Sequence, residues 1–462
     1  MTGRLLLCAP ASGSGKTTVT CALLQALVNR GAEPVAFKSG PDYIDPMFHS
    51  EIIGAKSRNL DLFLMGEAGV LASLSENGAG HPAIIEGAMG YYDGIAMGCD
   101  ASAYDLARRT KTPAVLVLDA RGCALSAAAL VAGFRDFRPS ANLKGVILNR
   151  VSAMLYPRLK ECIEAETGVR VYGFLPECRE AALDSRHLGL VTAAEVANLK
   201  EKLAALAALA ERYLDIDGLL ALAAAVPELP DGQARQYVPV PGKPRIAIAR
   251  DKAFCFYYAD ALLLLERLGA ELVEFSPLED PGLPEGIQGL YLGGGYPELY
   301  AQALSENVEM RRAVREAIRG GLPTIAECGG FLYLHRELED SQGSFWPMAE
   351  VFPRRAVRTE KLSQFGYVGI TARKDGLLAR AGETLPAHEF HYWKSEAPGG
   401  DFLAEKPQST RHWDCAYHSP SLYAGFPQVH LAGAPQAARR FVERCAAYPN
   451  RGGTAGAAPR SF

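Results

Sequence analysis

One stretch decides the fold of the first half of this chain: Arg4-Leu5-Leu6-Leu7-Cys8-Ala9-Pro10-Ala11-Ser12-Gly13-Ser14-Gly15-Lys16-Thr17-Thr18. An apolar run of strand length leads into a turn rich in Gly and Ser, and the helix-favouring segment 19–27 follows. Backbone N–H groups of such a turn and the N-terminus of the helix can bind phosphate oxygens. The pattern predicts a nucleotide-binding P-loop, with Lys16 at the terminal phosphates and Thr17 as a ligand of Mg²⁺.

The predicted ATP-binding residues of this loop are seven consecutive ones, Ser12, Gly13, Ser14, Gly15, Lys16, Thr17 and Thr18. A strict P-loop has Gly where this chain has Pro10, which lacks an N–H and fixes its own backbone. We therefore interpret the loop as a variant without its first glycine. A turn that binds no ligand is the alternative, and the flanking strand and helix argue against it.

Carboxylates follow the predicted strands of the first half. Apolar runs alternate there with helix-length segments, at 5–7, 34–37, 83–85, 114–118 and 145–148, which predicts an α/β fold with a parallel sheet. Asp42 and Asp45 follow the second run, and Glu86 ends the third. Ligands of open α/β sheets collect at the carboxyl ends of strands, and Mg²⁺ prefers carboxylate oxygens. These three residues are therefore candidates for a metal–nucleotide site.

The chain is long enough for two domains, since its 462 residues exceed the usual size of one core. Segment 226–244 is rich in Pro, Gly and polar residues, and a second series of apolar runs follows at 245–249, 271–275, 289–292 and 323–326. We predict a P-loop-type parallel-sheet domain at 1–225, a linker at 226–244, a second α/β domain at 245–447 and a disordered tail at 448–462.

A second motif, Ala326-Glu327-Cys328-Gly329-Gly330, follows an apolar run and precedes a helical segment. This strand–turn–helix pattern is typical of a nucleophile presented on a sharp elbow. A helix N-terminus lowers the pKa of a thiol, so we expect the thiolate of Cys328 to be favoured. The glycine-rich segment 293–298 ends another strand and can direct N–H donors at an oxyanion. We assign that oxyanion hole to Gly294, Gly295 and Gly329.

A thiol acyl-transfer site also needs a base, normally histidine. Among nine histidines we choose His430, because it lies in an apolar, strand-like stretch late in the second domain. A lone histidine of this kind is more often structural, and that alternative stays open. His388 and His391 resemble a zinc motif but stand three residues apart rather than four, so we reject a zincin.

The composition limits the partners and the compartment. The 48 basic and 52 acidic residues give a net charge of −4 without basic blocks, so no nucleic acid is expected. The 10 cysteines form no CxxC pair, which favours a reducing compartment. The start of the chain is too short for a signal peptide, and no run reaches the ~20 apolar residues of a membrane span. We expect a cytoplasmic protein without membrane contact.

Up to residue 447 the chain resembles the cobyrinate a,c-diamide synthase family, which joins a dethiobiotin-synthetase-like ATP domain to a class I glutamine amidotransferase domain. The segments that carry the resemblance are 38–46, 86–94, 186–190, 249–254, 293–298, the elbow at Cys328, and 388–392. The resemblance implies that 1–225 binds ATP and a corrin. It implies that 245–447 is a flavodoxin-like α/β domain that releases ammonia from glutamine.

The implied reaction is the amidation of the a- and c-carboxylates of cobyrinate, in cobalamin biosynthesis. ATP with Mg²⁺ forms acyl phosphates, and L-glutamine supplies the ammonia that displaces each phosphate. By analogy with the family, Asp42 and Asp45 would bind ATP, and Thr17, Asp45 and Glu86 would hold the metal.

The same analogy assigns the remaining site residues. Tyr43, Ile44 and Asp93 would bind the reacting corrin carboxylates. Cys328 would attack the glutamine amide while His430 moves protons. Gln428 departs from the pattern, because many relatives carry a second histidine at that position, and side chains two apart on a strand share a face. The nucleophile is therefore better defined than the base.

Alternatives stay open. The acceptor can be metal-free hydrogenobyrinate or Ni-sirohydrochlorin, because the sequence does not specify the ring or its metal. Cobyric acid synthase is the nearest rival, but it is not expected to carry segment 40–46. A regulatory protein with decayed sites is a different class. The residues that argue against it are intact: Lys16, Thr17, Glu86 and Cys328. The sequence is compatible with a homodimer as well as a monomer.

Overall fold

The computed structural model of the chain describes residues 3–178, 199–229 and 235–449. Two compact units divide the chain, Met1–Arg235 and Gln236–Phe462, and the division lies within segment 226–244. The functional limits of the two domains remain predictions. Segment 186–190 and tail residues 450–462 lie outside the described residues. In the described ranges, no helix is both long and apolar enough to cross a membrane.

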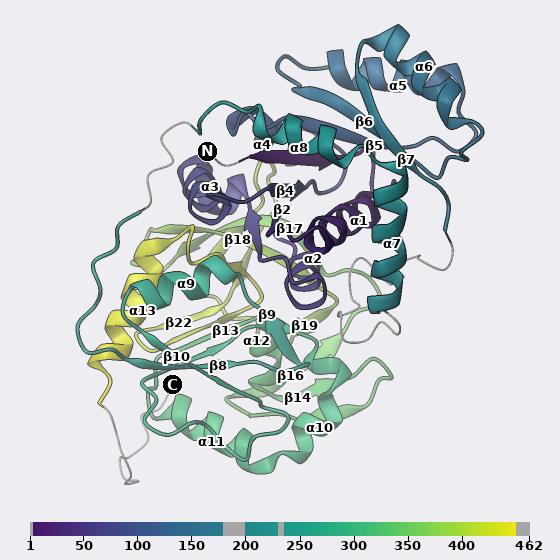
Figure 1. Ribbon diagram of the computed structural model, residues 1–462. Helices are drawn as coiled ribbons and strands as arrows, with labels where there is room; N and C mark the ends of the chain where they lie inside the picture. The colour runs from purple at the N-terminus through teal and green to yellow at the C-terminus, as the bar shows by residue number, and fades with distance from the viewer. Residues whose placement is uncertain (1–2, 179–198, 230–234, 450–462) are drawn as a thin grey trace. The chain divides into compact units, whose positions relative to one another are not determined.

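The first unit is built on a seven-stranded parallel sheet in the order β3-β2-β4-β1-β5-β6-β7 (Figure 1). The strands are β1 (Arg4–Cys8), β2 (Val35–Ser39), β3 (Ser57–Leu60), β4 (Ala83–Glu86), β5 (Ala114–Asp119), β6 (Leu143–Asn149) and β7 (Arg170–Leu175). The predicted parallel α/β sheet and its five predicted strands are confirmed. The pattern misses β3, whose sequence is largely polar, and also β7. Glu86 therefore ends the fourth strand rather than the third.

Helices pack against this sheet through apolar stripes. They are α1 (Lys16–Asn29), α2 (Ile44–Met47), α3 (Leu62–Gly78), α4 (Ala103–Arg109), α5 (Leu125–Asp136), α6 (Tyr156–Thr167), α7 (Leu199–Tyr213) and α8 (Ile216–Ala224), with a π-helix at Phe48–Ile53. In α1, Val19, Leu23 and Leu27 recur every four residues and are fully buried. They share one core cluster with Leu203 and Leu206 of α7. This packing fixes the start of α1 at the carboxyl end of β1, a central strand of the sheet.

The second unit has a six-stranded sheet in the order β10-β8-β11-β13-β23-β22. The strands are β8 (Arg245–Ala249), β10 (Glu271–Phe275), β11 (Gly289–Leu292), β13 (Thr324–Glu327), β22 (Tyr417–Ser419) and β23 (Leu422–Gly425). All neighbours are parallel except β22 and β23, which form an antiparallel pair. The predicted strands of this half are confirmed as β8, β10, β11 and β13. Cys328 follows β13, which lies between β11 and β23.

Three smaller sheets in the second unit go beyond the predicted alternation of strands and helices. They contain β9 (Phe254–Phe256) with β12 (Gly294–Gly295), then β14 (His335–Glu339), β15 (Phe345–Pro347), β16 (Phe352–Arg358) and β19 (Trp393–Ser395), and then β17 (Gln364–Ala372), β18 (Thr384–His391), β20 (Phe402–Glu405), β21 (His412–Cys415) and β24 (Gln428–Val429). The helices are α9 (Ala259–Arg267), α10 (Ala301–Glu306), α11 (Val308–Arg319), α12 (Gly329–Tyr333) and α13 (Pro435–Ala447), with a 3₁₀ turn at Pro297–Leu299. Long antiparallel pairs such as β17–β18 form where the sequence offers few continuous apolar runs.

Candidate active sites

The predicted P-loop connects β1 to α1. Gly13 and Gly15 have φ values of 81° and 95°, a left-handed conformation that glycine adopts without strain. A Cβ on Gly15 would also collide with the side chain of Asn149, which donates a hydrogen bond to the Ser14 carbonyl at 3.0 Å. Asn149 ends β6, so a strand two positions from β1 in the sheet braces the loop. Sequence reasoning missed this contact because it joins residues far apart in the chain.

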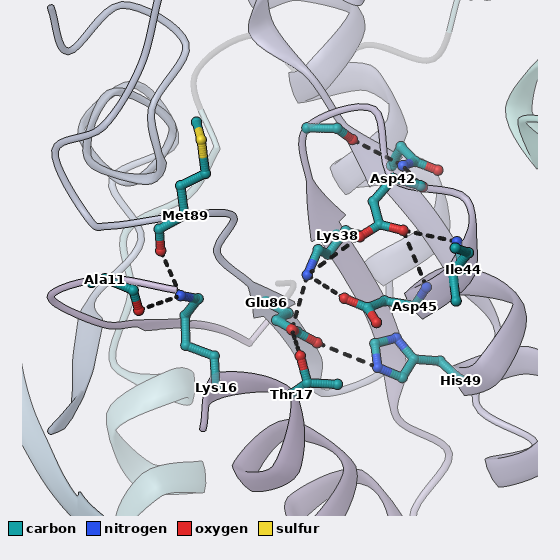
Figure 2. Close-up of polar contacts among 12 residues, drawn as sticks. Ala11, Lys16, Thr17, Lys38, Asp42, Ile44, Asp45, His49, Glu86 and Met89 are labelled. Carbon is teal, nitrogen blue, oxygen red and sulfur yellow. Dashed lines mark hydrogen bonds and ion pairs between the residues drawn. The ribbon is translucent and has the colours of Figure 1, made fainter. Parts of the chain in front are cut away.

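Lys16 is buried at the first position of α1. Its Nζ donates hydrogen bonds to the carbonyl oxygens of Ala11 at 3.3 Å and of Met89 at 2.5 Å. Burial and the nearby charge of Lys38 lower its pKa. Figure 2 shows the ammonium between the P-loop and the loop after β4, where phosphate oxygens can replace the two carbonyls. Ser12 and Gly13 are exposed at the same loop.

Three neighbouring strands, β1, β4 and β2, bring the predicted carboxylates to the start of α1. The Thr17 hydroxyl donates a hydrogen bond to Glu86 Oε1 at 2.6 Å. Lys38, opposite Glu86 in the register of β2 and β4, lies 2.9 Å from the same oxygen. Parallel neighbours in register place their side chains on one face, so the fold itself assembles this cluster.

Lys38 is a residue of this cluster that sequence reasoning left without a role. Its Nζ forms an ion pair with Asp45 and lies 3.9 Å from Asp42, as well as contacting Glu86 (Figure 2). Burial opposes its charge, but the three carboxylates prevail and hold the pKa of Lys38 well above its usual range. Burial likewise opposes the charge of Glu86, yet Lys38, His49 and Thr17 hold its pKa well below the ordinary value. Lys38 and Glu86 are therefore ionised, whereas burial and the charge of Glu86 raise the pKa of Asp45 well above its ordinary value.

The predicted corrin-binding residues, Tyr43, Ile44 and Asp93, lie near this cluster in the sequence but differ in how far they are exposed. Tyr43 is buried, and Ile44 begins α2 half-buried. Asp42 accepts hydrogen bonds from the N–H groups of Ile44 and Asp45 at 2.8 and 3.3 Å, so it caps α2. Asp93 is exposed and accepts from Gly90 N–H at 2.9 Å, which closes the turn after β4. Among the described residues, no ion pair joins Asp93 to the carboxylate cluster.

The residues at this edge of the sheet fit Mg²⁺ bound together with a nucleotide. No group of three His, Cys, Asp or Glu with metal-holding geometry occurs in the described ranges. Mg²⁺ of nucleotides needs fewer protein ligands, because phosphates and waters supply the rest. The atoms that could bind the metal here are oxygens. The Thr17 hydroxyl donates its proton to Glu86, so its lone pairs remain for a cation. Glu86 supplies negative charge, and Asp45 adds a further carboxyl oxygen.

Cys328 sits on the expected elbow of the second unit. Its φ and ψ are 47° and −102°, between β13 and α12, and its N–H donates to the Gly425 carbonyl at 2.8 Å. A Cβ on Gly330 would collide with the Leu292 carbonyl, so glycine is required beside the nucleophile. A strained backbone of this kind persists only where its surroundings fix it. The predicted strand–turn–helix geometry is confirmed.

The expected low pKa of this thiol is wrong. Burial raises the pKa of Cys328 to about 12, and the charges of Glu298 and Glu389 act in the same direction. The helix that follows has only five residues, so its dipole is small beside the cost of burying a thiolate. The resting thiol is therefore protonated and needs a base.

The three predicted oxyanion residues come together. Gly294 and Gly295 form β12 after β11, and the Cβ position of Gly329 lies 3.0 Å from Gly295 N. Gly330 N–H donates to the Gly293 carbonyl at 2.9 Å, which ties the two glycine segments to each other. Backbone amides of both segments thus lie beside the nucleophile elbow.

His430 follows the short strand β24 rather than lying inside a strand, and it is 1% exposed. Its ring stacks on Tyr258 with centroids 4.2 Å apart, and neither ring nitrogen has a hydrogen-bond partner among the described residues. Burial lowers its pKa to about 3, so the imidazole is neutral in the resting site. No hydrogen bond joins it to Cys328 within the described chain, and its role as base remains a prediction.

Gln428 and His388 are opposite residues of β24 and β18. Gln428 Oε1 lies 3.1 Å from the Cβ position of Gly294 and has no hydrogen-bond partner in the described parts of the chain. His388 Nδ1 lies 3.4 Å from the Tyr258 hydroxyl, and burial lowers the pKa of His388 to about 3. His388 is therefore neutral, and Gln428 Oε1 lies close to the glycine segment at Gly294.

Comparisons with known proteins match a nucleotide-binding domain and a glutamine amidotransferase domain. The family model described as CobQ/CobB/MinD/ParA nucleotide binding domain matches residues 5–191, and the CobB/CobQ-like glutamine amidotransferase domain matches 245–419. Among solved structures, PurLQS from Thermotoga maritima is 14% identical, covers 44% of this chain and 97% of its own, and has a TM-score of 0.31, too low to support an argument.

Two curated relatives match along nearly their whole length. The cobyrinate a,c-diamide synthase of Caldanaerobacter subterraneus subsp. tengcongensis is 38% identical over 442 residues, which cover 95% of this chain and 97% of the relative. That of Fusobacterium nucleatum subsp. nucleatum is 40% identical over 457 residues, covering 95% and 98%. The chain belongs to the family of cobyrinate a,c-diamide synthases, in which a nucleotide-binding domain precedes a glutamine amidotransferase domain.

Proposed function

We propose that this protein amidates the a- and c-carboxylates of cobyrinate, using ATP and glutamine. The observation that carries the proposal is the presence in one chain of two complementary arrangements. One is a P-loop whose Thr17 bonds Glu86 at 2.6 Å, and the other is Cys328 on an elbow lined by glycine amides. The first activates an acid, and the second releases ammonia from an amide.

Activation takes place at the P-loop. A corrin carboxylate oxygen attacks the γ-phosphorus of ATP, the bond to the β,γ-bridging oxygen breaks, and ADP leaves. Lys16 binds the transferring phosphate in place of the Ala11 and Met89 carbonyls, because its ammonium already lies at the loop. Thr17, Asp45 and Glu86 would hold Mg²⁺, which would neutralise phosphate charge. Tyr43, Ile44 and Asp93 are proposed to position the ring.

Ammonia release takes place at Cys328. His430, neutral because burial lowers its pKa to about 3, accepts the thiol proton as the sulfur attacks the glutamine amide carbon. The proton passes to the leaving nitrogen, ammonia departs, and water hydrolyses the thioester to glutamate. Backbone N–H groups of Gly294, Gly295 and Gly329 stabilise the oxyanion. The ammonia then attacks the acyl phosphate and phosphate leaves.

The test uses the purified full chain with cobyrinate, ATP and Mg²⁺, and with either glutamine or ammonium as nitrogen source. Two successive carboxylate-to-amide mass changes from each nitrogen source support the proposal. Hydrolysis of glutamine without any amidated corrin contradicts cobyrinate as acceptor. In that case hydrogenobyrinate and Ni-sirohydrochlorin are tested in the same assay. No glutamine hydrolysis at all would favour a regulatory protein with decayed sites.

A further inference from the structure

A buried histidine, His49, lies beside the carboxylate cluster. His49 lies in the π-helix Phe48–Ile53, which continues from α2, and its side chain is 0% exposed. Its Nε2 is 3.5 Å from Glu86 Oε2 (Figure 2). Asp45 and His49 are four residues apart on this helical segment, and such residues lie on one helix face. One segment thus brings two polar side chains to the end of β4.

The two oxygens of Glu86 have different surroundings. Oε1 accepts from Thr17 at 2.6 Å and from Lys38 at 2.9 Å. Oε2 has no hydrogen-bond partner within the described residues, and its close polar neighbour is the His49 ring. Neither nitrogen of that ring has another hydrogen-bond partner there. A fully buried carboxylate oxygen needs a donor, and a fully buried imidazole needs an acceptor, so each supplies what the other lacks.

We infer that His49 is a positioning residue, which donates Nε2–H to Glu86 Oε2 and fixes the rotation of that carboxylate. With Oε2 held, Oε1 faces Thr17 and the metal–nucleotide site. If His49 only filled space, an apolar residue of similar size could replace it without loss, since packing would be its whole role. The inference rests on the proposed role of Glu86 in holding Mg²⁺ with ATP.

The test compares His49→Gln with His49→Met. Glutamine can place an amide N–H near the position of Nε2, whereas methionine fills the volume without a donor. The readout is binding of a non-hydrolysable ATP analogue by calorimetry as Mg²⁺ is titrated. Loss of a residue that orients a metal ligand typically costs about 10–100-fold in metal affinity. We expect a loss in this range for His49→Met and most of the affinity retained in His49→Gln.

Wild-type Mg²⁺ dependence in His49→Met would overturn the inference, and so would equal losses in both variants. If His49→Met does not fold, His49→Asn replaces it, because the shorter amide does not reach Glu86 and carries the same expectation. The matched control is His81→Met, which makes the same change at a partly exposed histidine of this unit and should leave nucleotide binding unchanged.

A third variant separates this inference from the proposed function. Glu86→Gln should weaken the Mg²⁺ dependence of nucleotide binding at least as much as His49→Met. If Glu86→Gln binds Mg²⁺ and the analogue normally, the metal role of Glu86 is wrong. If Glu86→Gln is impaired but His49→Met is normal, only the positioning role of His49 is wrong.

Discussion

The carboxylate of Glu327 accepts a hydrogen bond from the backbone N–H of Val429 at 2.8 Å. Glu327 immediately precedes the predicted nucleophile Cys328, and Val429 immediately precedes His430. The other oxygen of Glu327 accepts from the Tyr291 hydroxyl at 2.9 Å. One buried carboxyl therefore ties the elbow after β13 to β24, the short strand that the predicted base follows.

This carboxyl predicts a pH dependence of stability. Burial raises the pKa of Glu327 from 4.5 to about 7. The folded state therefore binds the proton more tightly than the unfolded chain, so the stabilisation is full below pH 4.5 and is lost as pH rises through about 7. Glu327→Gln should reduce the fall in unfolding free energy over this window by on the order of 3 kcal/mol, measured by urea unfolding.

The matched control is Glu443→Gln on the surface of α13, which should keep the full fall in stability. Part of the fall will persist in Glu327→Gln, because burial also raises the pKa of Glu298 to about 7. An unchanged pH profile in Glu327→Gln would show that Glu327 is ionised throughout this range.

Removal of the nucleophile should separate the two nitrogen sources. Cys328→Ala should lower glutamine-dependent amidation and glutamine hydrolysis at least about 1,000-fold, because no thioester can form. Amidation with ammonium should continue, since the acyl phosphate forms at the P-loop. Product masses and glutamate release measure both. Cys162→Ala, at a partly buried cysteine of α6, is the control, and residual glutamine hydrolysis in Cys328→Ala would point to another nucleophile.

The glycine after the elbow should tolerate no side chain. Gly330→Ala places a methyl group against the Leu292 carbonyl, so we expect a loss of about 1–3 kcal/mol in unfolding free energy together with loss of glutamine hydrolysis. Gly400→Ala is the matched control, because no atom lies within 4 Å of its Cβ position. Normal hydrolysis in Gly330→Ala would mean that the elbow moves freely.

Lys38 should contribute strongly to the unfolding free energy of the protein in the absence of nucleotide. Lys38→Met leaves Asp42, Asp45 and Glu86 without their shared cation, which should cost about 3–5 kcal/mol. Mg²⁺ should raise the melting temperature of Lys38→Met more than that of the wild type, because the ion binds the freed carboxylates. Lys38→Arg keeps the charge and should melt near the wild type. An unchanged melting temperature in Lys38→Met would contradict this electrostatic role.

Local patterns in the sequence predicted much of both sites. The P-loop and the Cys328 elbow each combine an apolar run, glycines and a helical segment within a few residues, so neighbours in sequence are neighbours in space. The same holds for the predicted strands, whose apolar runs are continuous. The polar strand β3 and the antiparallel sheets of the second unit escaped because packing against distant segments, rather than local pattern, makes them strands.

The sequence by itself determined the residue types of the two sites, the parallel α/β sheets and the membership of the family. Only the tertiary structure decided which of these residues meet. Strand order places β2 beside β4, which brings Lys38 to Glu86, and the helical segment after β2 brings His49 to the same carboxylate. Burial, which local pattern cannot measure, reverses the expected ionisation of Cys328 and raises its pKa to about 12. A pKa depends on every charge and solvent boundary near a group, and these are properties of the folded chain.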